Sequence, residues 1–467
     1  MPTLAPALLR ALPSSSRPLA ALADRLRDHR GHFALAETVA AARPYLLGGL
    51  YAALGGQMLV VTPTTDVAER TYSDLTYWLA DKVEELALLR PYDEEIGSLD
   101  NPTERAARMA ALGRLAAGEP SLVVAPLAAL RQALAPPQVL REERIAIAEG
   151  GPLDFEATLA QLHRLGYRRV EVVSAAGEYA VRGGILDLFP PQQPLPVRIE
   201  LWGDEVEEIR AFEIESQRST QRLSSVSVDA WHEVLRDQTL RAHVQERATG
   251  EEGVISAVRA FLAAGHDIPT AWTSLAYAQP ATLLDYFDAR AVVVLEEPAI
   301  LASLERAVEE ERARGRMRTI AEAEGEGQLS VDEALIADVM LAGLEAPRPT
   351  LGSMEGALRA RPLLTIPGGI EAEHPAWLPP ALETYALGCA NAEHFNRSID
   401  LFLTAAREWL AAGETLAIVS TGATRIRELL RGAGLEPDQT PAHLHLRSVA
   451  GAGAALRAHL FVDHGSI

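Results

Sequence analysis

Hydrophobic and polar residues alternate with a period of two near the middle of the chain. In the segment VRIEL (197–201), valine, isoleucine and leucine are separated by Arg198 and Glu200, as in a strand with one buried face. Strand-forming residues also fill 179–189, on both sides of a glycine pair, and 206–212, after a Gly-Asp pair. These runs predict a β-meander with charged side chains on one face, which is typical of a docking surface.

A different pattern fills the first 130 residues, where short apolar runs are separated by longer helical stretches. We predict strands at 32–36, 58–61, 86–89 and 121–125 and helices at 37–54, 66–87 and 104–117. Strands and helices alternating at this length predict a parallel sheet covered on both faces. The apolar run 291–295 predicts a further strand of the same domain, so the meander is inserted within it.

The predicted fold class is therefore multidomain α/β. The parallel-sheet domain occupies 1–140 and 236–330, the inserted α+β meander module 141–235, and a small α/β domain 345–467. The last begins with a proline-containing linker, and we predict within it a helix at 391–411, a strand at 415–420 and a helix at 424–431.

Composition narrows the range of functions. The chain has 43 basic and 64 acidic residues, a net charge of −21, which argues against a main task of coating DNA because phosphate binding needs clustered positive charge. Cys389 is the single cysteine, so a disulfide framework is excluded and a reducing cytoplasm is expected. Residues 1–10 lack a signal-peptide pattern, and glycine and proline interrupt the longest uncharged run, 44–65, so no membrane span is expected.

The meander closely resembles a module shared by two bacterial families, the excision-repair protein UvrB and the transcription-repair coupling factor Mfd. The shared elements GEY, RG, DLFP, RIE, GDE and QRS follow one another in register between residues 177 and 219. In that family the module docks onto UvrA, the damage sensor.

The resemblance implies that arginines around these strands engage acidic groups on UvrA, with a phenylalanine as apolar anchor. The implied contacts are Arg168, Arg169, Tyr179, Arg182, Phe189, Arg198 and Glu200. The alternative is that the two aromatic residues belong to the core and the arginines are ordinary solvated partners of nearby glutamates.

The parallel-sheet domain resembles the first RecA-like motor half of UvrB and related helicases. A working phosphate loop after its first strand would read G-x-x-x-x-G-K-S/T. Residues 36–43 read AETVAAAR instead, which places Glu37 where phosphate would sit and ends in Arg43. Lys82, the only lysine of the chain, lies well past the second strand. We therefore expect no nucleotide cofactor in this segment.

An acidic pair supports this interpretation. Glu296-Glu297 follows the strand 291–295 and an LLDY segment, an arrangement that resembles the metal-holding acidic box of helicases. A carboxylate pair could hold Mg²⁺, but without a phosphate cradle the ion has nothing to bridge. Together with Glu37 and Arg43, this pair is expected to form an inactive remnant of a nucleotide site.

The C-terminal stretch contains scattered histidines. A metal site can be imagined from His443, His445, His459, Asp463 and His464. No cysteine joins them and Mfd is not a metal protein, so we expect no metal site there.

The resemblance favours Mfd over UvrB, because 131–159 holds a single aromatic residue, Phe155, where UvrB has an aromatic-rich hairpin that grips DNA. It implies a non-catalytic N-terminal part that recruits UvrA in transcription-coupled nucleotide excision repair. Full-length family members have further regions that bind RNA polymerase and that translocate on DNA with ATP and Mg²⁺, and a C-terminal domain that contacts the N-terminal part. This chain is expected to be either a piece of such a protein or a natural short form. The alternative function is a UvrB-like, ATP-dependent enzyme that binds damaged DNA.

Overall fold

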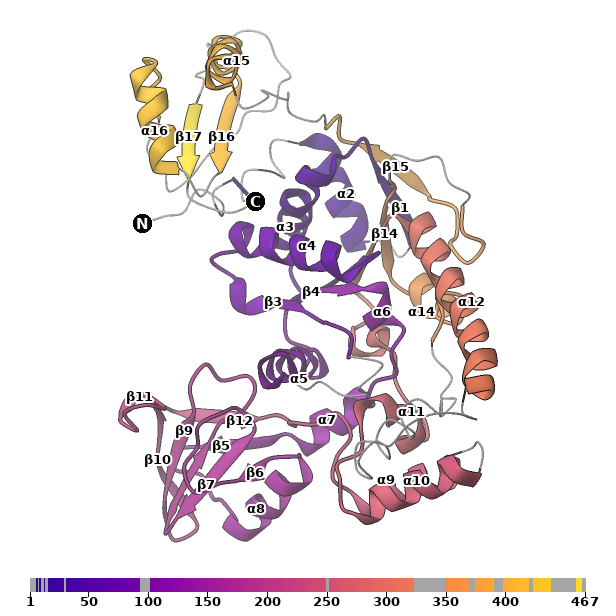
Figure 1. Cartoon of the computed structure of the whole chain (residues 1–467). Helices are drawn as coiled ribbons and strands as arrows, with labels where there is room; N and C mark the ends of the chain where they lie inside the picture. Colours follow the sequence, from indigo (N-terminus) through magenta and orange to yellow (C-terminus); the bar gives the residue numbers. More distant parts are fainter. Residues whose placement is uncertain are drawn as a thin grey trace.

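Two large sheets and one small unit make up the protein. The computed structural model describes residues 16–28, 31–92, 101–248, 252–322, 349–368, 374–389, 398–419, 423–437 and 459–463, together with residues 6, 8, 9 and 12. In Figure 1 the seven-stranded sheet lies in the middle, the six-stranded sheet below it at the left, and the small C-terminal unit above.

The seven-stranded sheet is parallel throughout, with strand order β15-β1-β14-β13-β2-β4-β3. Its two central strands from the first half of the chain are buried at every position, as expected for a parallel sheet with both faces covered. The strands are β1 (Gly31–Ala36), β2 (Gln57–Thr62), β3 (Leu86–Leu88), β4 (Ser121–Pro126), β13 (Val292–Glu296), β14 (Pro362–Ile366) and β15 (Glu383–Ala386).

Successive side chains of these strands pack alternately into two different hydrophobic cores, one on each face of the sheet. Met58 and Val60 pack with the helices α2 (Arg17–Asp28), α3 (Arg43–Leu54) and α4 (Thr65–Trp78) on one face. Leu59 and Val61 face the opposite side. That side is covered by α5 (Pro102–Ala116), α6 (Leu127–Leu130), α12 (Pro298–Glu322) and α14 (Glu355–Arg359).

Two predicted helices are shorter in the structure. The helix predicted at 37–54 starts only at Arg43, after the 3-10 turn η1 (Ala40–Ala42), because Glu37 adopts a left-handed φ of 54° that cannot continue a helix. The helix predicted at 66–87 ends at Trp78, and the turn η2 (Val83–Glu85) then leads directly into β3.

The six-stranded sheet is inserted between β4 and β13. Its order is β11-β10-β9-β8-β7-β6, antiparallel except for the β6–β7 pair. The strands are β6 (Arg168–Arg169), β7 (Glu178–Arg182), β8 (Ile185–Leu188), β9 (Val197–Trp202), β10 (Glu205–Phe212) and β11 (Ser219–Leu223). A separate pair, β5 (Ile145–Ala148) with β12 (Ser225–Val228), and the helices α7 (Pro137–Glu143) and α8 (Phe155–Arg164) complete this module. The predicted meander is therefore confirmed.

The segment 131–159, compared above with the DNA-gripping hairpin of UvrB, folds here as α7, β5 and the start of α8. Its single aromatic side chain, Phe155, is half-buried and packs against the main core. After β12 the chain forms α9 (Gln238–Arg247), α10 (Glu252–Ala263), η3 (Thr270–Trp272), α11 (Thr273–Ala276) and η4 (Leu283–Tyr286) before it enters β13.

The boundary predicted for the small domain differs from the structure. Strands β14 and β15 lie in the large sheet on both sides of β1, so that sheet draws on residues up to 386. The small unit consists of α15 (Ile399–Ala411), β16 (Thr415–Val419), α16 (Ala423–Gly432) and β17 (His459–Asp463). Its first helix begins at Ile399 because the Ser398 side chain caps it by accepting a hydrogen bond from the Leu401 amide.

Some predictions fall on residues outside the described ranges. His443, His445 and His464 lie there, as does residue 420 of the predicted strand. None of the helices in the described part of the chain is both long and apolar enough to cross a membrane.

Candidate functional site

The six-stranded sheet has an inner face that joins the main core and an outer face that carries charge. On β9, Val197 and Ile199 are fully buried in the core, whereas the side chains of Arg198, Glu200 and Trp202 alternate with them and point the other way. Trp202 is 81% exposed, an unusual position for the largest aromatic side chain.

An aspartate organises the centre of the outer face. Asp187 on β8 accepts hydrogen bonds from Arg198 Nε at 2.7 Å and Nη2 at 3.0 Å, and a further one from Arg182. The Arg198 guanidinium also lies over the ring of Phe212, 4.7 Å from its centroid, and its hydrogen bonds with Asp187 raise its pKa above the usual value. Arg198, with a side chain only 16% exposed, therefore stabilises the sheet, while Arg182 remains 49% exposed.

A second arginine–carboxylate pair lies at the edge of the same face. Arg168 Nη2 donates to Glu178 Oε1 at 2.5 Å, and the Arg168 side chain is 74% exposed. Glu178 also accepts hydrogen bonds from Ser174 and from the Ala175 amide. Burial alone would raise the pKa of Glu178, but these hydrogen bonds outweigh it and hold the pKa below its usual value. Glu178 is thus a fixed anion that orients Arg168.

The structure separates the aromatic residues named from the sequence. Tyr179 is 6% exposed and packs in the main core on the inner face. Phe189 is half-buried on the outer face, beside a small cluster of Val173, Ala180 and Phe212.

Of the remaining predicted residues, Arg169 is exposed on the edge strand β6, and Glu200 lies half-buried opposite Glu208. Trp202 was not among the predicted contacts, although a tryptophan directly before a Gly-Asp turn could have indicated an exposed anchor.

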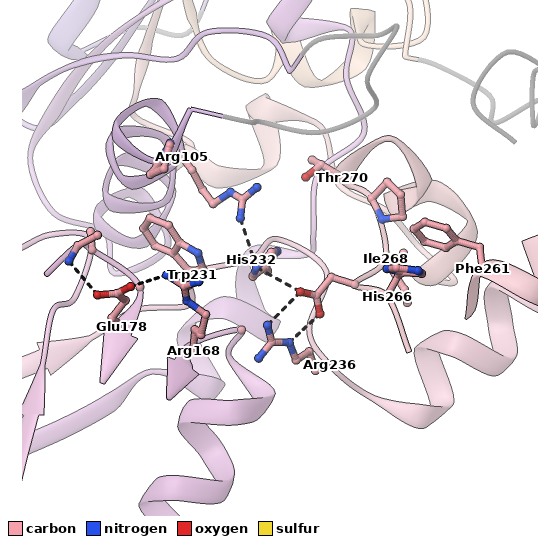
Figure 2. A pocket seen from close by; sticks show the side chains of 17 residues that line it. Arg105, Arg168, Glu178, Trp231, His232, Arg236, Phe261, His266, Ile268 and Thr270 are labelled. Atoms are coloured by element: carbon pink, nitrogen blue, oxygen red, sulfur yellow. Dashed lines mark hydrogen bonds and ion pairs between the residues drawn. The ribbon is translucent and has the colours of Figure 1, made fainter. Parts of the chain in front are cut away.

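A cavity of about 560 Å³ lies beside Arg168 and Glu178. Figure 2 shows side chains on its walls from three further parts of the chain: Arg105 on α5, Trp231 and His232 after β12, and Phe261 on α10 with the segment 266–270 that follows this helix. The Arg105 guanidinium lies over the Trp231 ring, 5.6 Å from its centroid, and Arg105 Nη1 is 3.4 Å from His232 Nε2.

The floor of this cavity is a chain of polar contacts. Asp267 accepts hydrogen bonds from Arg236 at 2.6 and 3.0 Å and lies 3.8 Å from His232 Nε2. Burial, reinforced by the positive charge of Arg105, lowers the pKa of His232 to about 4. His232 is therefore neutral at physiological pH, and the charges on the cavity wall come from arginines and carboxylates.

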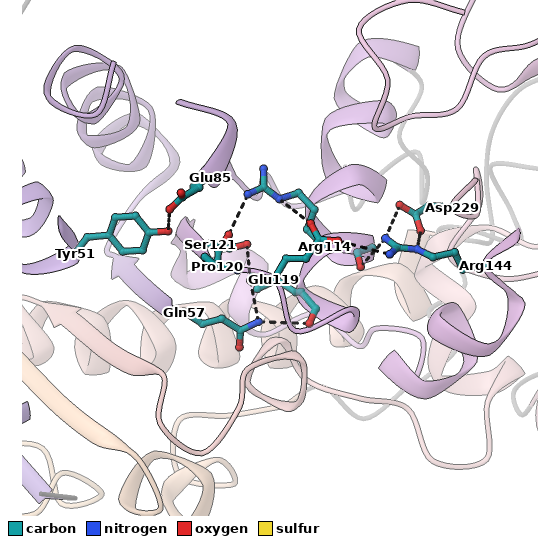
Figure 3. A network of polar contacts seen from close by, with 11 residues as sticks. Tyr51, Gln57, Glu85, Arg114, Glu119, Pro120, Ser121, Arg144 and Asp229 are labelled. Carbon is teal, nitrogen blue, oxygen red and sulfur yellow. Dashed lines mark hydrogen bonds and ion pairs between the residues drawn. The ribbon is translucent and has the colours of Figure 1, made fainter. Parts of the chain in front are cut away.

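Polar contacts of two arginines connect the inserted module to helix α5, which covers the seven-stranded sheet. Figure 3 shows Arg144, directly before β5, donating to both oxygens of Asp229. Arg144 also donates to the carbonyl of Gly113 on α5. A Cβ at Gly113 would lie 2.4 Å from Asp229 Oδ2, so only glycine permits this approach. A second contact is the ion pair between Arg108 Nε on α5 and Glu233 Oε2 at 2.7 Å, and both side chains are almost fully buried.

Three of the four residues predicted to form a degenerate nucleotide site lie together in a cluster at the end of the seven-stranded sheet. Arg43, the first residue of α3, extends to the end of β13, where its Nη1 lies 2.9 Å from Glu297 Oε1 and 4.0 Å from Glu296 Oε2. Glu37 lies directly after β1, where its carbonyl accepts a hydrogen bond from the Cys389 amide. The structure therefore brings Arg43, Glu296 and Glu297 together.

Burial of this cluster changes the pKa of one of its carboxyl groups. Glu296 is 1% exposed, and burial raises its pKa to about 7 in spite of the nearby Arg43. The Arg43 guanidinium lies beside both carboxylates of this pair. Across the described residues, no three His, Cys, Asp or Glu side chains gather as a metal site would require.

Comparison with known proteins points to one family. The family model of the UvrB interaction domain matches residues 145–233. The transcription-repair-coupling factor of Bacillus subtilis (strain 168) is 30% identical over 280 residues, which is 55% of this chain and 23% of that protein. The protein of the same name from Staphylococcus epidermidis is 29% identical over 259 residues, 52% of this chain and 22% of that protein.

The chain spans less than a quarter of the length of these relatives. The matched domain contains the whole six-stranded sheet with its arginine-bearing outer face. The chain is homologous to the N-terminal region of transcription-repair-coupling factor (Mfd), with its UvrB interaction domain.

Proposed function

We propose that this chain recruits UvrA to stalled transcription complexes in transcription-coupled nucleotide excision repair, as the non-catalytic N-terminal part of a coupling factor. The observation that carries the proposal is the match of residues 145–233 to the UvrB interaction domain, which in Mfd binds UvrA. Its six-stranded sheet presents a rigid charged face, as a docking surface requires.

The proposed contact residues are those of the outer face that reach solvent. Arg168 and Arg182 each hold one internal carboxylate and remain about half exposed or more, so their outer edges can pair with acidic groups of a partner. Phe189 and Trp202 supply apolar surface, and Arg169 and Glu200 lie at the margin. Arg198 positions Asp187 beneath Arg182. Tyr179 acts from the core, where it supports the strand.

The seven-stranded sheet is proposed to be a degenerate RecA-like domain that carries the module. Arg43 and the two glutamates form an internal ion-pair cluster, and residues 36–43 supply neither the glycines nor the lysine of a phosphate loop. In a full-length coupling factor we assign ATP, Mg²⁺, DNA translocation and contacts with RNA polymerase to regions other than these 467 residues. A C-terminal domain of such a protein would contact this N-terminal part.

A titration of the chain with UvrA, with and without nucleotide, tests the proposal. The double variant Arg168→Ala, Arg182→Ala should bind UvrA at least about tenfold more weakly, or about 1.4 kcal/mol, because desolvated interface arginines contribute strongly. Its melting temperature should stay near that of the wild type, since both side chains are solvent-exposed.

Arg141→Ala is the matched control, because Arg141 is an exposed arginine on α7 at the start of the module. It removes one positive charge by the same substitution and should leave UvrA binding unchanged. Equal binding by the double variant and the wild type would show that the docking surface lies elsewhere. Failure of the wild-type chain to bind UvrA at all would overturn the function itself.

A further inference from the structure

We propose that the cavity beside Arg168 receives an acidic side chain of the docked UvrA, so that the docking surface continues beyond the matched domain onto helix α5 and the segment after α10. This inference rests on the proposed function. It assigns a role to Arg105 and Thr270, which lie outside residues 145–233.

Position is the first argument. Arg168 and Glu178 belong both to the outer face of the six-stranded sheet and to the cavity wall, so a partner that covers Arg168 also covers the opening. Figure 2 shows Arg105 and Thr270 on the walls across from that pair. A volume of about 560 Å³ admits a whole side chain and some of its backbone.

Charge is the second argument. The described lining includes three guanidinium groups, from Arg105, Arg168 and Arg236, against the carboxylates of Glu178 and Asp267. Glu178 is held by Ser174 and Ala175 as well as by Arg168, and Asp267 is chelated by Arg236. Both internal carboxylates are thus already satisfied, and the wall carries more cationic than anionic groups. An incoming carboxylate complements it.

Part of the remaining wall is apolar. Trp231, Phe261 and Ile268 are each buried by more than nine-tenths and line the cavity. The Arg168 side chain is 74% exposed in the free chain, and a partner docked over it would remove water from around it. An ion pair that is desolvated in this way is stronger than the same pair on an open surface. The stem of a glutamate or aspartate would contact these apolar side chains while its carboxylate meets Arg168.

A pair of isosteric substitutions tests the charge directly. Thr270→Glu places a negative charge on the cavity wall, and Thr270→Gln adds the same volume without charge. Residue 270 begins the short helix η3, where an acidic side chain is tolerated. We expect Thr270→Glu to bind UvrA at least about fivefold more weakly than Thr270→Gln, because like charges repel in a confined site.

A second variant removes a wall cation instead. Arg105→Ala should weaken UvrA binding about three- to tenfold, while Arg141→Ala keeps wild-type affinity, and melting temperatures monitor folding of each variant. Equal UvrA affinity of the two Thr270 variants, with Arg105→Ala also matching the wild type, overturns the inference. If the wild-type chain binds UvrA and only the Arg168, Arg182 double variant is impaired, the proposed function stands and the cavity has no part in it.

Discussion

Two arginine–carboxylate clusters in this chain share their chemistry and differ in burial. At the end of the seven-stranded sheet, Arg43 is 11% exposed and lies between two glutamates. On the six-stranded sheet, Arg182 and Arg168 pair with Asp187 and Glu178, yet both arginines face solvent. The first cluster is closed by its own side chains, and the second is open to a partner.

The difference shows that an arginine can either fill a site with its own side chain or expose its guanidinium to a partner. In the closed cluster the Arg43 guanidinium, on α3, pairs with carboxylates at the end of β13, and only 11% of its side chain is exposed to a ligand. In the open cluster the carboxylates are the buried members, and they orient the arginines outward. Both clusters contain a buried carboxylate, so the exposure of the arginine itself decides whether its guanidinium can reach a partner, and this can be tested at both clusters.

The largest expected effect comes from breaking the closed cluster. Arg43→Ala should lower the free energy of unfolding by about 3 kcal/mol, because it leaves two glutamates without their cation in a buried position. Arg182→Ala in the open cluster should cost less than about 1 kcal/mol, since its side chain is half exposed and Arg198 still holds Asp187. Urea denaturation of both variants at pH 7 measures the contrast, and equal losses would contradict it.

A pH profile sharpens the same comparison. Glu296 keeps its proton up to a pKa of about 7 in the folded chain, against 4.5 for an ordinary glutamate. The folded state thus binds the extra proton, and stability falls as pH rises from 4.5 through 7. Relative to wild type, Glu296→Gln should gain about 2 kcal/mol between pH 5 and pH 8. Parallel stability curves for the two proteins across this range would refute the assignment.

Local sequence patterns predict β1 to β4 and β13 of the large sheet and the central strands β7 to β10 of the six-stranded sheet, but they miss β14, β15 and the edge strands β6 and β11. Alternation over 197–201 and the turn residues beside it specify the meander, and the structure confirms those strands. Strands β14 and β15 pair with β1 across more than 300 residues, a contact that periodicity cannot reveal. A prolyl segment near 345 therefore resembled a domain boundary, although the large sheet continues past it.

The docking face shows a similar limit. Tyr179 and Arg182 are three residues apart on one strand, so the period of two places them on opposite faces. That rule was available from the sequence, and the structure shows Tyr179 inside. The cavity was not predictable in the same way, because its walls come from separate stretches around residues 105, 168, 232 and 267, which only the tertiary fold brings together.

A smaller effect is expected for the binding of DNA, whose phosphates would replace partner carboxylates at the open cluster. At a net charge of −21, the chain should bind duplex or damaged DNA weakly and without preference for a lesion at physiological salt, because the few exposed arginines lie on an anionic molecule. Gel shifts across a salt series measure this. Submicromolar binding that discriminates a lesion would favour the UvrB-like alternative and would make the open cluster a nucleic-acid surface.

The smallest expected effect is at the closed cluster, where we expect no saturable binding of ATP. Phosphate binding needs backbone amides from a glycine loop and a lysine, whereas η1 and the start of α3 supply alanines and Arg43, whose guanidinium lies 2.9 Å from Glu297. Titration with a fluorescent ATP analogue, with and without Mg²⁺, measures the affinity. The variant Glu296→Gln, Glu297→Gln is the informative companion, because it removes the repelling carboxylates while leaving the loop unchanged. If those carboxylates alone prevented binding, the variant would bind ATP more tightly than the wild type. We expect neither protein to bind ATP. Mg²⁺-dependent binding of ATP by the wild type in the micromolar range would show that the site is functional.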